Sequence, residues 1–313
     1  MAQVDTKHIY QSLFANLAIA CGKGVASFVT GSGAMLAETI HSAADASNQI
    51  LLLFGVTRAR KPADTAHPLG YGRDLYFWSF IVALLLFTGG GLFSIYEGLH
   101  KLAHPELPEK LWLAYLILGL SLVIEGGATL SNVKELNRRR GAVPFFRYLA
   151  RSKDSDLIVV FGENAAASLG LILALVSLAL VQATRNPIYD AIGTLLIGAV
   201  LMAVAIFLAV EIKALLVGEA ADPGVAAAAH ELGAAQPLID ELFEIITVQQ
   251  GPGEVLLACK ARFSEGATAR QICQAINEFE IELRARRPEV KWCFVEADIP
   301  PEQASAKAQA AGG

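Results

Sequence analysis

Residues 31–56 read GSGAMLAETIHSAADASNQILLLFGV, an apolar stretch with ionisable and amide side chains at its centre. A transmembrane helix needs about 20 mostly apolar residues, and this stretch has that length. Its polar residues Glu38, His41, Asp45 and Asn48 are spaced three, four and three apart. Such positions share one face of a helix. Because desolvating these groups is costly, we expect that face to point into a helix bundle or a water-filled cavity.

The rest of the chain has the composition of a membrane protein. Of its 313 residues, 54% are hydrophobic and 18% are charged, and the mean hydropathy is positive. Stretches long enough to span a bilayer are predicted at residues 10–30, 32–56, 76–99, 111–133, 157–183 and 188–217. Six transmembrane helices would leave both ends of the chain on the same side.

The basic residues predict which side that is, because cytoplasmic loops carry an excess of Lys and Arg. One side would hold Lys7, Arg58, Arg60, Lys61, Arg73, Lys134, Arg138, Arg139, Arg140, Arg147, Arg151 and Lys153, and the other only Lys101, Lys110 and Arg185. We therefore expect both termini in the cytoplasm and the chain in a bacterial inner membrane. The net charge of -5 and the lack of a basic, aromatic-rich tract argue against a nucleic-acid partner.

After residue 217 the sequence changes to that of a soluble domain. Asp222-Pro223 predicts a helix start, and Thr268 with Gln271 has the spacing of a capping box. The predicted order is α-β-β-α-β, with helices at 220–235 and from Thr268 to Pro288, and strands at 241–249, 255–263 and 290–297. We therefore predict residues 1–217 as a six-helix transport domain, 218–300 as a cytoplasmic α+β domain of ferredoxin-like type, and 301–313 as a disordered tail.

The α+β domain has a single histidine, His230, so we expect it to support dimerisation rather than to bind a metal cluster. The chain has four cysteines without CxxC spacing, which argues against a zinc knuckle or a redox pair. We interpret all four as small buried apolar residues.

The polar face of residues 38–48 carries the chemistry. His41 and Asp45 stand at i and i+4, so an imidazole nitrogen and a carboxylate can bind one metal ion together. A second helix must complete such a site, and the fifth predicted span offers Glu163 and Asn164 among small residues that permit close packing. These neighbours differ by about 100° around a helix, so both cannot face the same ion. The alternative is a polar cluster that only holds helices together, with Asn164 in an interhelical hydrogen bond.

Three segments in sequence order resemble the cation diffusion facilitator family of divalent-metal transporters. They are residues 31–55, the loop HPLGYGRDLYFWSF at 67–80, and FSIYEGLHKLAHPE at 93–106. The resemblance extends to about residue 300. It implies a homodimer in the lipid bilayer, with a tetrahedral site between the second and fifth helices that exchanges Zn²⁺ or a similar ion for protons. The ion is then the cargo, and no cofactor is implied.

The same resemblance maps the ligands and shows a departure. His41 and Asp45 match the pair on the second helix, while Val160 and Asn164 stand where the family usually has His and Asp. A branch of the family carries Glu-Asp at this point, and Glu163-Asn164 looks like its variant, so Glu163 is the competing ligand. A site with more oxygen donors favours harder ions such as Mn²⁺ or Fe²⁺.

Further candidates lie near this pair and in the loop after the second span. Glu38 and Asn48 share the polar face, and many relatives bind metal in the loop through residues that match Asp64 and His67. Tyr71 replaces the last histidine of that loop pattern. The alternative is that residues 67–73 form a structural turn.

Together with the resemblance, these observations predict a secondary transporter that exports a divalent transition metal from the cytoplasm in exchange for protons. Zn²⁺ is the first expectation, and Mn²⁺, Fe²⁺, Co²⁺ and Ni²⁺ are the alternatives. Cytoplasmic metal would be attracted by Asp64 and Glu38. One rival is a non-transporting dimeric sensor or scaffold, which Val160 and Asn164 favour. The other is an intramembrane metallohydrolase, but the chain lacks His-Glu-x-x-His and has no second histidine inside a span. We therefore expect no enzyme activity.

Overall fold

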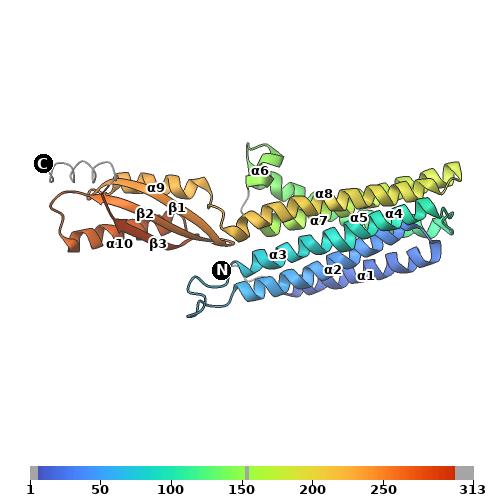
Figure 1. The fold of residues 1–313 in the computed structure, drawn as a ribbon, viewed down its shortest axis with the longest axis horizontal. Coiled ribbons are helices and arrows are strands. Elements are labelled where there is room, and N and C mark those ends of the chain that lie inside the picture. The colour runs from blue at the N-terminus through green and yellow to red at the C-terminus, as the bar shows by residue number, and fades with distance from the viewer. Residues whose placement is uncertain (1–5, 152–154, 300–313) are drawn as a thin grey trace. The chain divides into compact units, whose positions relative to one another are not determined.

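The computed structural model describes residues 6–151 and 155–299 (Figure 1). The chain divides into two compact units. The helical unit takes in the chain up to Lys61 and from Asp74 to Lys213, and the sheet unit takes in Pro62–Arg73 and the chain from Ala214 onward. The predicted tail at residues 301–313 lies outside the described residues.

The helical unit places a helix on every predicted span. Its elements are α1 (Thr6–Thr30), α2 (Gly33–Ala59), α3 (Asp74–Leu85), η1 (Leu86–Leu92), α4 (Phe93–Ala103), α5 (Leu111–Arg140), α6 (Phe145–Arg151), α7 (Ser155–Thr184) and α8 (Ile188–Val217). The short helix α6 was not predicted.

Four helical segments of the described chain are long and apolar enough to cross a membrane. They are Asp74–Ala103, Leu111–Arg140, Val160–Thr184 and Ile188–Val217. Helix α2 has 27 residues, but its polar face lowers its hydropathy. Residues Leu17–Thr30 of α1 form a shorter apolar helical segment.

The segment α3–η1–α4 runs continuously, but its middle, LFTGGGL, is a π-helix of seven residues. The sequence alone predicted an ordinary helix here. Two glycines of this segment, Gly91 of η1 and Gly98 of α4, let α8 approach closely. A Cβ on Gly91 would collide with Met202 of α8, and one on Gly98 would collide with Leu195 of the same helix. Short π segments inside helices are rare and are frequently found at functional sites.

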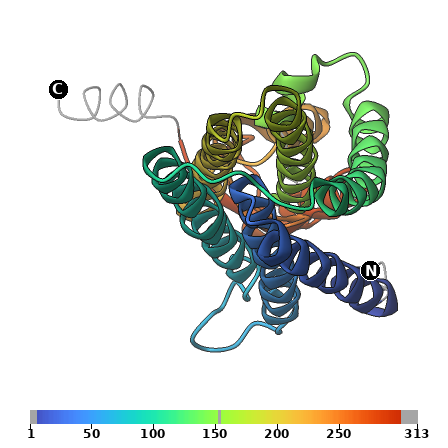
Figure 2. The same cartoon turned by 90° about the vertical axis from the view of Figure 1, so that its right-hand side faces the viewer.

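Helix α2 is enclosed by its neighbours, which hides its polar face. It contacts α1, α3 and α7, and α5 contacts both α1 and α7. Figure 2 shows these helices nearly end-on, with α1 and α2 in blue beside α5 in green and α7 and α8 in olive. The predicted polar stripe therefore points into the bundle, where its groups need partners.

The start of α2 is held by a carboxylate from α8. Ser32 caps the helix, and its hydroxyl donates to Oδ1 of Asp190 at 2.6 Å. The backbone N–H groups of Gly33 and Ala34 donate to the two oxygens of the same carboxylate at 2.7 and 3.3 Å. Lys101 of α4 lies 3.7 Å from Asp190, which is fully buried. An anion at a helix N-terminus is stabilised by free N–H groups and by the helix dipole.

The sheet unit has the predicted order of elements. They are α9 (Pro223–Ala235), β1 (Ile239–Gly251), β2 (Glu254–Phe263), α10 (Ala269–Arg286) and β3 (Val290–Ala297). Asp222 caps α9, and Thr268 and Gln271 form the capping box of α10 as predicted. Strand β2 lies centrally, antiparallel to β1 and parallel to β3.

Both helices pack on one face of this sheet. The core joins Val225 and Leu232 of α9 to Phe279 and Leu283 of α10 over inward residues such as Leu257 of β2. The opposite face exposes Ile246 and Phe294, which the strand register places on either side of Ala258. An apolar sheet face without a covering helix is typical of an interaction surface.

The prediction for the cysteines is half wrong. Cys259 and Cys293 are buried in the core of the sheet unit, whereas Cys21 and Cys273 are exposed. Burial raises the pKa of the Cys259 and Cys293 thiols to about 12.

The segment between α2 and α3 packs inside the sheet unit, against the turn that joins β1 and β2. A Cβ on Gly72 would lie 2.7 Å from the carbonyl oxygen of Gln250 and 3.1 Å from the Cα of Gly251. Only two glycines allow the backbones to come this close.

Candidate metal site

His41 and Asp45 of α2 form the pair that the sequence predicted. His41 is fully buried, and its Nε2 lies 3.5 Å from Oδ2 of Asp45, whose side chain is 19% exposed. Both ring nitrogens of His41 and Oδ1 of Asp45 have no hydrogen-bond partner among the described residues. Buried polar atoms nearly always have partners, so this unsatisfied pair points to a ligand.

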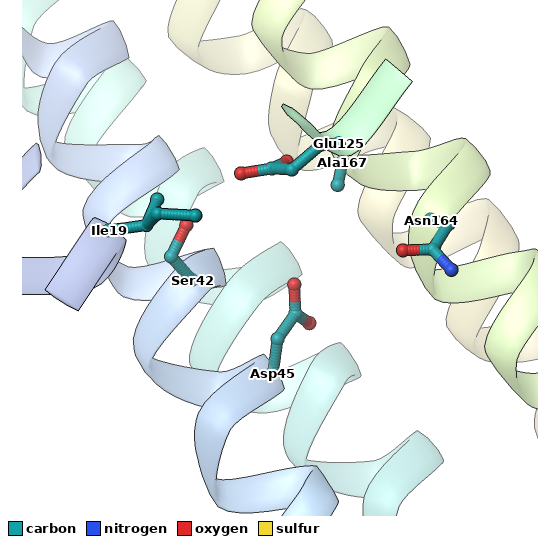
Figure 3. A pocket seen from close by; sticks show the side chains of 6 residues that line it. All are labelled: Ile19, Ser42, Asp45, Glu125, Asn164 and Ala167. Atoms are coloured by element: carbon teal, nitrogen blue, oxygen red, sulfur yellow. The ribbon is translucent and has the colours of Figure 1, made fainter. Parts of the chain in front are cut away.

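Asp45 opens into a small cavity where four helices meet. Ile19 of α1, Ser42 and Asp45 of α2, Glu125 of α5, and Asn164 and Ala167 of α7 line it (Figure 3). Figure 3 shows the Asp45 carboxylate extending from α2 into the space below Glu125, with Asn164 on the opposite helix. The cavity measures about 30 Å³. A water needs roughly 10–15 Å³, so the cavity has the size for a small hydrated ligand.

The two neighbours on α7 have different surroundings. Asn164 lines the cavity, whereas the buried carboxylate of Glu163 accepts a hydrogen bond from Nδ2 of Asn48 at 2.7 Å. The Thr129 hydroxyl of α5 donates to the backbone carbonyl oxygen of Asn164 and lies 2.7 Å from the Ser168 hydroxyl. These contacts connect α5 to α7 beside the cavity. Val160, one turn before Asn164, is 37% exposed.

Glu38, a further candidate ligand, is held by a lysine. The fully buried Nζ of Lys23 lies 3.2 Å from Oε2 of Glu38, 2.9 Å from Oε1 of Glu125 and 2.8 Å from Oγ of Ser42. Both Lys23 and Glu125 are charged residues inside apolar stretches, which is a sequence signal for this contact, but no spacing indicates that they pair. A small residue on α7 makes room, since a Cβ on Gly170 would collide with Oε1 of Glu38.

Asp64 and His67 belong to the loop of the sheet unit, whereas this cluster belongs to the helical unit. Both oxygens of Asp64 already have protein partners, because Oδ1 accepts from the N–H groups of Ala66 and His67 and Oδ2 from the Tyr71 hydroxyl at 2.6 Å. The hydrogen bond from Tyr71, with those of the backbone, holds the pKa of the Asp64 carboxyl below its usual value. The His67 ring packs on Tyr71 with its Nδ1 3.5 Å from Asp64. This geometry is that of a closed turn.

Among the side chains that the structure describes, no group of three His, Cys, Asp or Glu could hold a metal ion. The donors that line the cavity are instead the carboxylates of Asp45 and Glu125 and the carboxamide of Asn164, and His41 lies beside Asp45. The unsatisfied atoms of His41 and Asp45 on α2, together with the half-buried Asn164 on α7, make this the candidate metal site.

A family model described as the cation efflux transmembrane domain matches residues 9–217. The chain belongs to the cation diffusion facilitator family. The match includes α2 and α7, the two helices that carry the candidate ligands. This family consists of membrane transporters and not of enzymes, so the chain is an integral membrane protein and the prediction of no enzyme activity is confirmed.

Several named proteins of this family are similar to the chain. The proton-coupled zinc antiporter SLC30A9, mitochondrial, of Xenopus laevis is 33% identical over 243 residues, which is 77% of this chain and 44% of that protein. The human protein of that name is 34% identical over 250 residues, 79% of this chain and 44% of that protein. Metal tolerance protein C4 of Arabidopsis thaliana is 30% identical over 264 residues, 84% and 58% of the two chains. The facilitator chain thus spans about half the length of these relatives.

Proposed function

We propose that the protein is a secondary transporter that moves a divalent transition-metal cation, Zn²⁺ first, across a membrane in exchange for protons. Mn²⁺, Fe²⁺, Co²⁺ and Ni²⁺ are the alternative cargoes. The names of the animal relatives, which describe proton-coupled zinc antiporters, support both parts of this proposal.

The observation that carries the proposal is the unsatisfied His41–Asp45 pair beside a cavity inside the bundle. Imidazole nitrogen and carboxylate oxygen are the donors that zinc uses in proteins. A purely structural role would give these buried atoms protein partners, as it does for Glu163 with Asn48.

We assign the donor on α7 to Asn164, since its carboxamide lines the same cavity as Asp45 while Glu163 is engaged with Asn48. The cation would then have one nitrogen donor and at least two oxygen donors. This set accepts zinc and also harder ions such as Mn²⁺. Water can fill a further position.

Exchange for protons follows from the ligand chemistry. His41 and Asp45 must be deprotonated to bind a metal, so binding releases protons, and a proton-rich side displaces the ion. Rocking of the bundle would expose the site to each side in turn, with export from the cytoplasm as the direction. Glu38 contributes negative charge near the path, and Asp64 does so in the loop.

The membrane arrangement is a second part of the proposal. Six crossings are formed by α1, α2, the continuous segment α3–η1–α4, α5, α7 and α8, with both termini in the cytoplasm. The exposed sheet face with Ile246 and Phe294 is the surface on which two copies would join as a homodimer. The membrane is one that maintains a proton gradient, the inner membrane of a bacterium or, in line with the names of the relatives, of a mitochondrion.

Uptake by proteoliposomes with an imposed pH gradient tests the function. The uptake of Zn²⁺, Mn²⁺, Fe²⁺, Co²⁺ and Ni²⁺ is compared for the wild type, Asp45→Ala and the control Ser47→Ala. The exposed hydroxyl of Ser47 donates to the backbone carbonyl of Ala43 on its own helix. We expect gradient-driven Zn²⁺ flux that Asp45→Ala reduces at least about tenfold and Ser47→Ala leaves unchanged. Metal flux that does not depend on the pH gradient, for any of the five ions, would contradict antiport. Binding without flux would favour a sensor or scaffold.

A further inference from the structure

Lys23 is the cationic side chain within the polar cluster that the described part of the bundle encloses. It is fully buried on α1, and its ammonium group contacts Glu38 and Ser42 of α2 and Glu125 of α5. Each carboxylate keeps one oxygen, Oε1 of Glu38 and Oε2 of Glu125, without a hydrogen-bond partner among the described residues. The ammonium group of Lys23 is therefore surrounded by two carboxylates and a hydroxyl group.

This arrangement has the donor chemistry of a cation site. Two carboxylates and a hydroxyl are oxygen ligands of the kind that divalent cations take. Because both carboxylates lie within hydrogen-bonding distance of one nitrogen, a single ion at that position can reach both. Ser42 and Glu125 also line the cavity that holds Asp45 and Asn164, so the position adjoins the proposed transport site.

We propose that Lys23 is a tethered cation that occupies a second cation position, formed by Glu38 and Glu125, and thereby limits each protomer to one divalent ion in the bundle. The inference rests on the proposed transport site at His41, Asp45 and Asn164. In this role, Lys23 sets the number of divalent ions that each protomer binds.

Charge balance supports this limit. The cluster holds four carboxyl groups, on Glu38, Asp45, Glu125 and Glu163, against one ammonium group. With Lys23 in place, a second divalent ion would leave the ionised cluster net positive inside an apolar bundle, which is strongly unfavourable. With a neutral residue there, two divalent ions would balance the four carboxylates.

Metal counting on the purified full-length protein tests the inference. Bound Zn²⁺ per protomer is measured by equilibrium dialysis and elemental analysis for the wild type, Lys23→Met and Lys23→Gln. Lys23→Arg keeps the charge. Lys101→Met is the matched control, since Lys101 also pairs with a buried carboxylate of the bundle, Asp190, but lies outside the cluster.

We expect both uncharged variants to bind one Zn²⁺ more than the wild type, and Lys23→Arg and Lys101→Met to bind the wild-type number. Adding Glu125→Gln to Lys23→Met should remove the extra ion. A wild-type count in both uncharged variants would overturn the inference. Loss of a folded, monodisperse protein in both variants would also overturn it, because Lys23 would then be purely structural.

Failure of the proposed transport site gives a different result. Asp45→Ala should lower the count by one both in the wild type and in Lys23→Met. If Asp45→Ala changes neither count, the transport site is misplaced. If it lowers the count while Lys23→Met adds no ion, the transport site stands and the role of Lys23 is refuted.

Discussion

Asn48 of α2 donates a hydrogen bond from Nδ2 to Oε1 of Glu163 on α7 at 2.7 Å, and both side chains are buried. This bond fixes how α7 is rotated against α2. Because Glu163 is engaged with Asn48, its neighbour Asn164 is the residue that lines the cavity with Asp45. In the proposed transport site, Glu163 therefore holds α7 against α2, and Asn164 is the donor on α7.

Replacing Glu163 and its neighbour Asn164 on α7 should change Zn²⁺ flux to very different extents. Asn164→Ala should lower Zn²⁺ flux about tenfold or more, equivalent to about 1.4 kcal/mol, since it removes a ligand. Glu163→Gln should keep flux within about twofold, because its amide oxygen still accepts from Asn48. Initial rates in proteoliposomes provide the measurement. A silent Asn164→Ala with an inactive Glu163→Gln would reverse our assignment.

Restoring the usual ligand pair of the family should change selectivity. Val160 and Asn164 are one helical turn apart, so the double variant Val160→His with Asn164→Asp adds an imidazole and a carboxylate to the site. Affinity for Zn²⁺ relative to Mn²⁺ should rise about tenfold, because imidazole suits zinc better. Competition binding on the purified protein measures this ratio. An unchanged ratio would mean that residue 160 does not reach the ion.

Asp190→Asn should destabilise the bundle without touching the cavity. The carboxylate accepts three hydrogen bonds at the start of α2, and an amide would turn an N–H group toward donors. We expect a loss of about 1–3 kcal/mol in unfolding free energy. Thermal unfolding in detergent is compared with Glu106→Gln, an exposed acid in the loop after α4. Equal midpoints for the two variants would show that the bonds to α2 contribute little.

Two glycines of the π-helix form a matched pair. A Cβ on Gly91 would collide with Met202, whose backbone nitrogen lies 3.2 Å away, while one on Gly89 meets nothing within 4 Å. Gly91→Ala should cost about 1–3 kcal/mol through overpacking, and Gly89→Ala should be neutral or gain up to about 1 kcal/mol. Thermal unfolding of both variants gives the comparison. Similar stabilities would indicate that α8 is free to move away.

Thiol labelling should separate the cysteines of the sheet unit. Cys259 and Cys293 are buried with pKa values of about 12, so very little reactive thiolate exists at pH 8. Iodoacetamide should modify exposed Cys273 more than about a hundredfold faster than it modifies Cys259 or Cys293. Peptide mass spectrometry follows each site, with denatured protein as the reference.

The free energy of unfolding should fall as the pH rises from about 9 to 12. The thiols of Cys259 and Cys293 ionise at a lower pH in the unfolded chain than in the folded one, so rising pH favours the unfolded chain.

Much of this fold could be predicted because its signals are local. Hydropathy located every long helix, and the caps at Asp222 and Thr268 located the starts of α9 and α10. The π-helix could not be predicted, since GGG within an apolar run has no distinctive pattern. Its cause is the close approach of α8, which is a tertiary contact.

The candidate site could also be predicted only in part. Helical spacing alone placed Glu38, His41 and Asn48 on one buried face. The partners of that face come from remote segments: Lys23 and Glu125 are 102 positions apart, and Asn48 and Glu163 are 115 apart. Nothing in the sequence near Asp190 indicated that it would cap α2. Such pairings are set by the packing of helices, which no local pattern records.

The contact between Gly72 and Gly251 affects how any truncation must be interpreted. The loop from Pro62 to Arg73 directly follows the helix that carries His41 and Asp45, yet it belongs to the sheet unit. Deleting the chain after residue 217 would therefore remove the packing partner of that loop as well as the sheet. A transport defect in such a deletion cannot be attributed to lost dimerisation alone. Single substitutions at Ile246 or Phe294, which leave this contact in place, are the cleaner genetic probe.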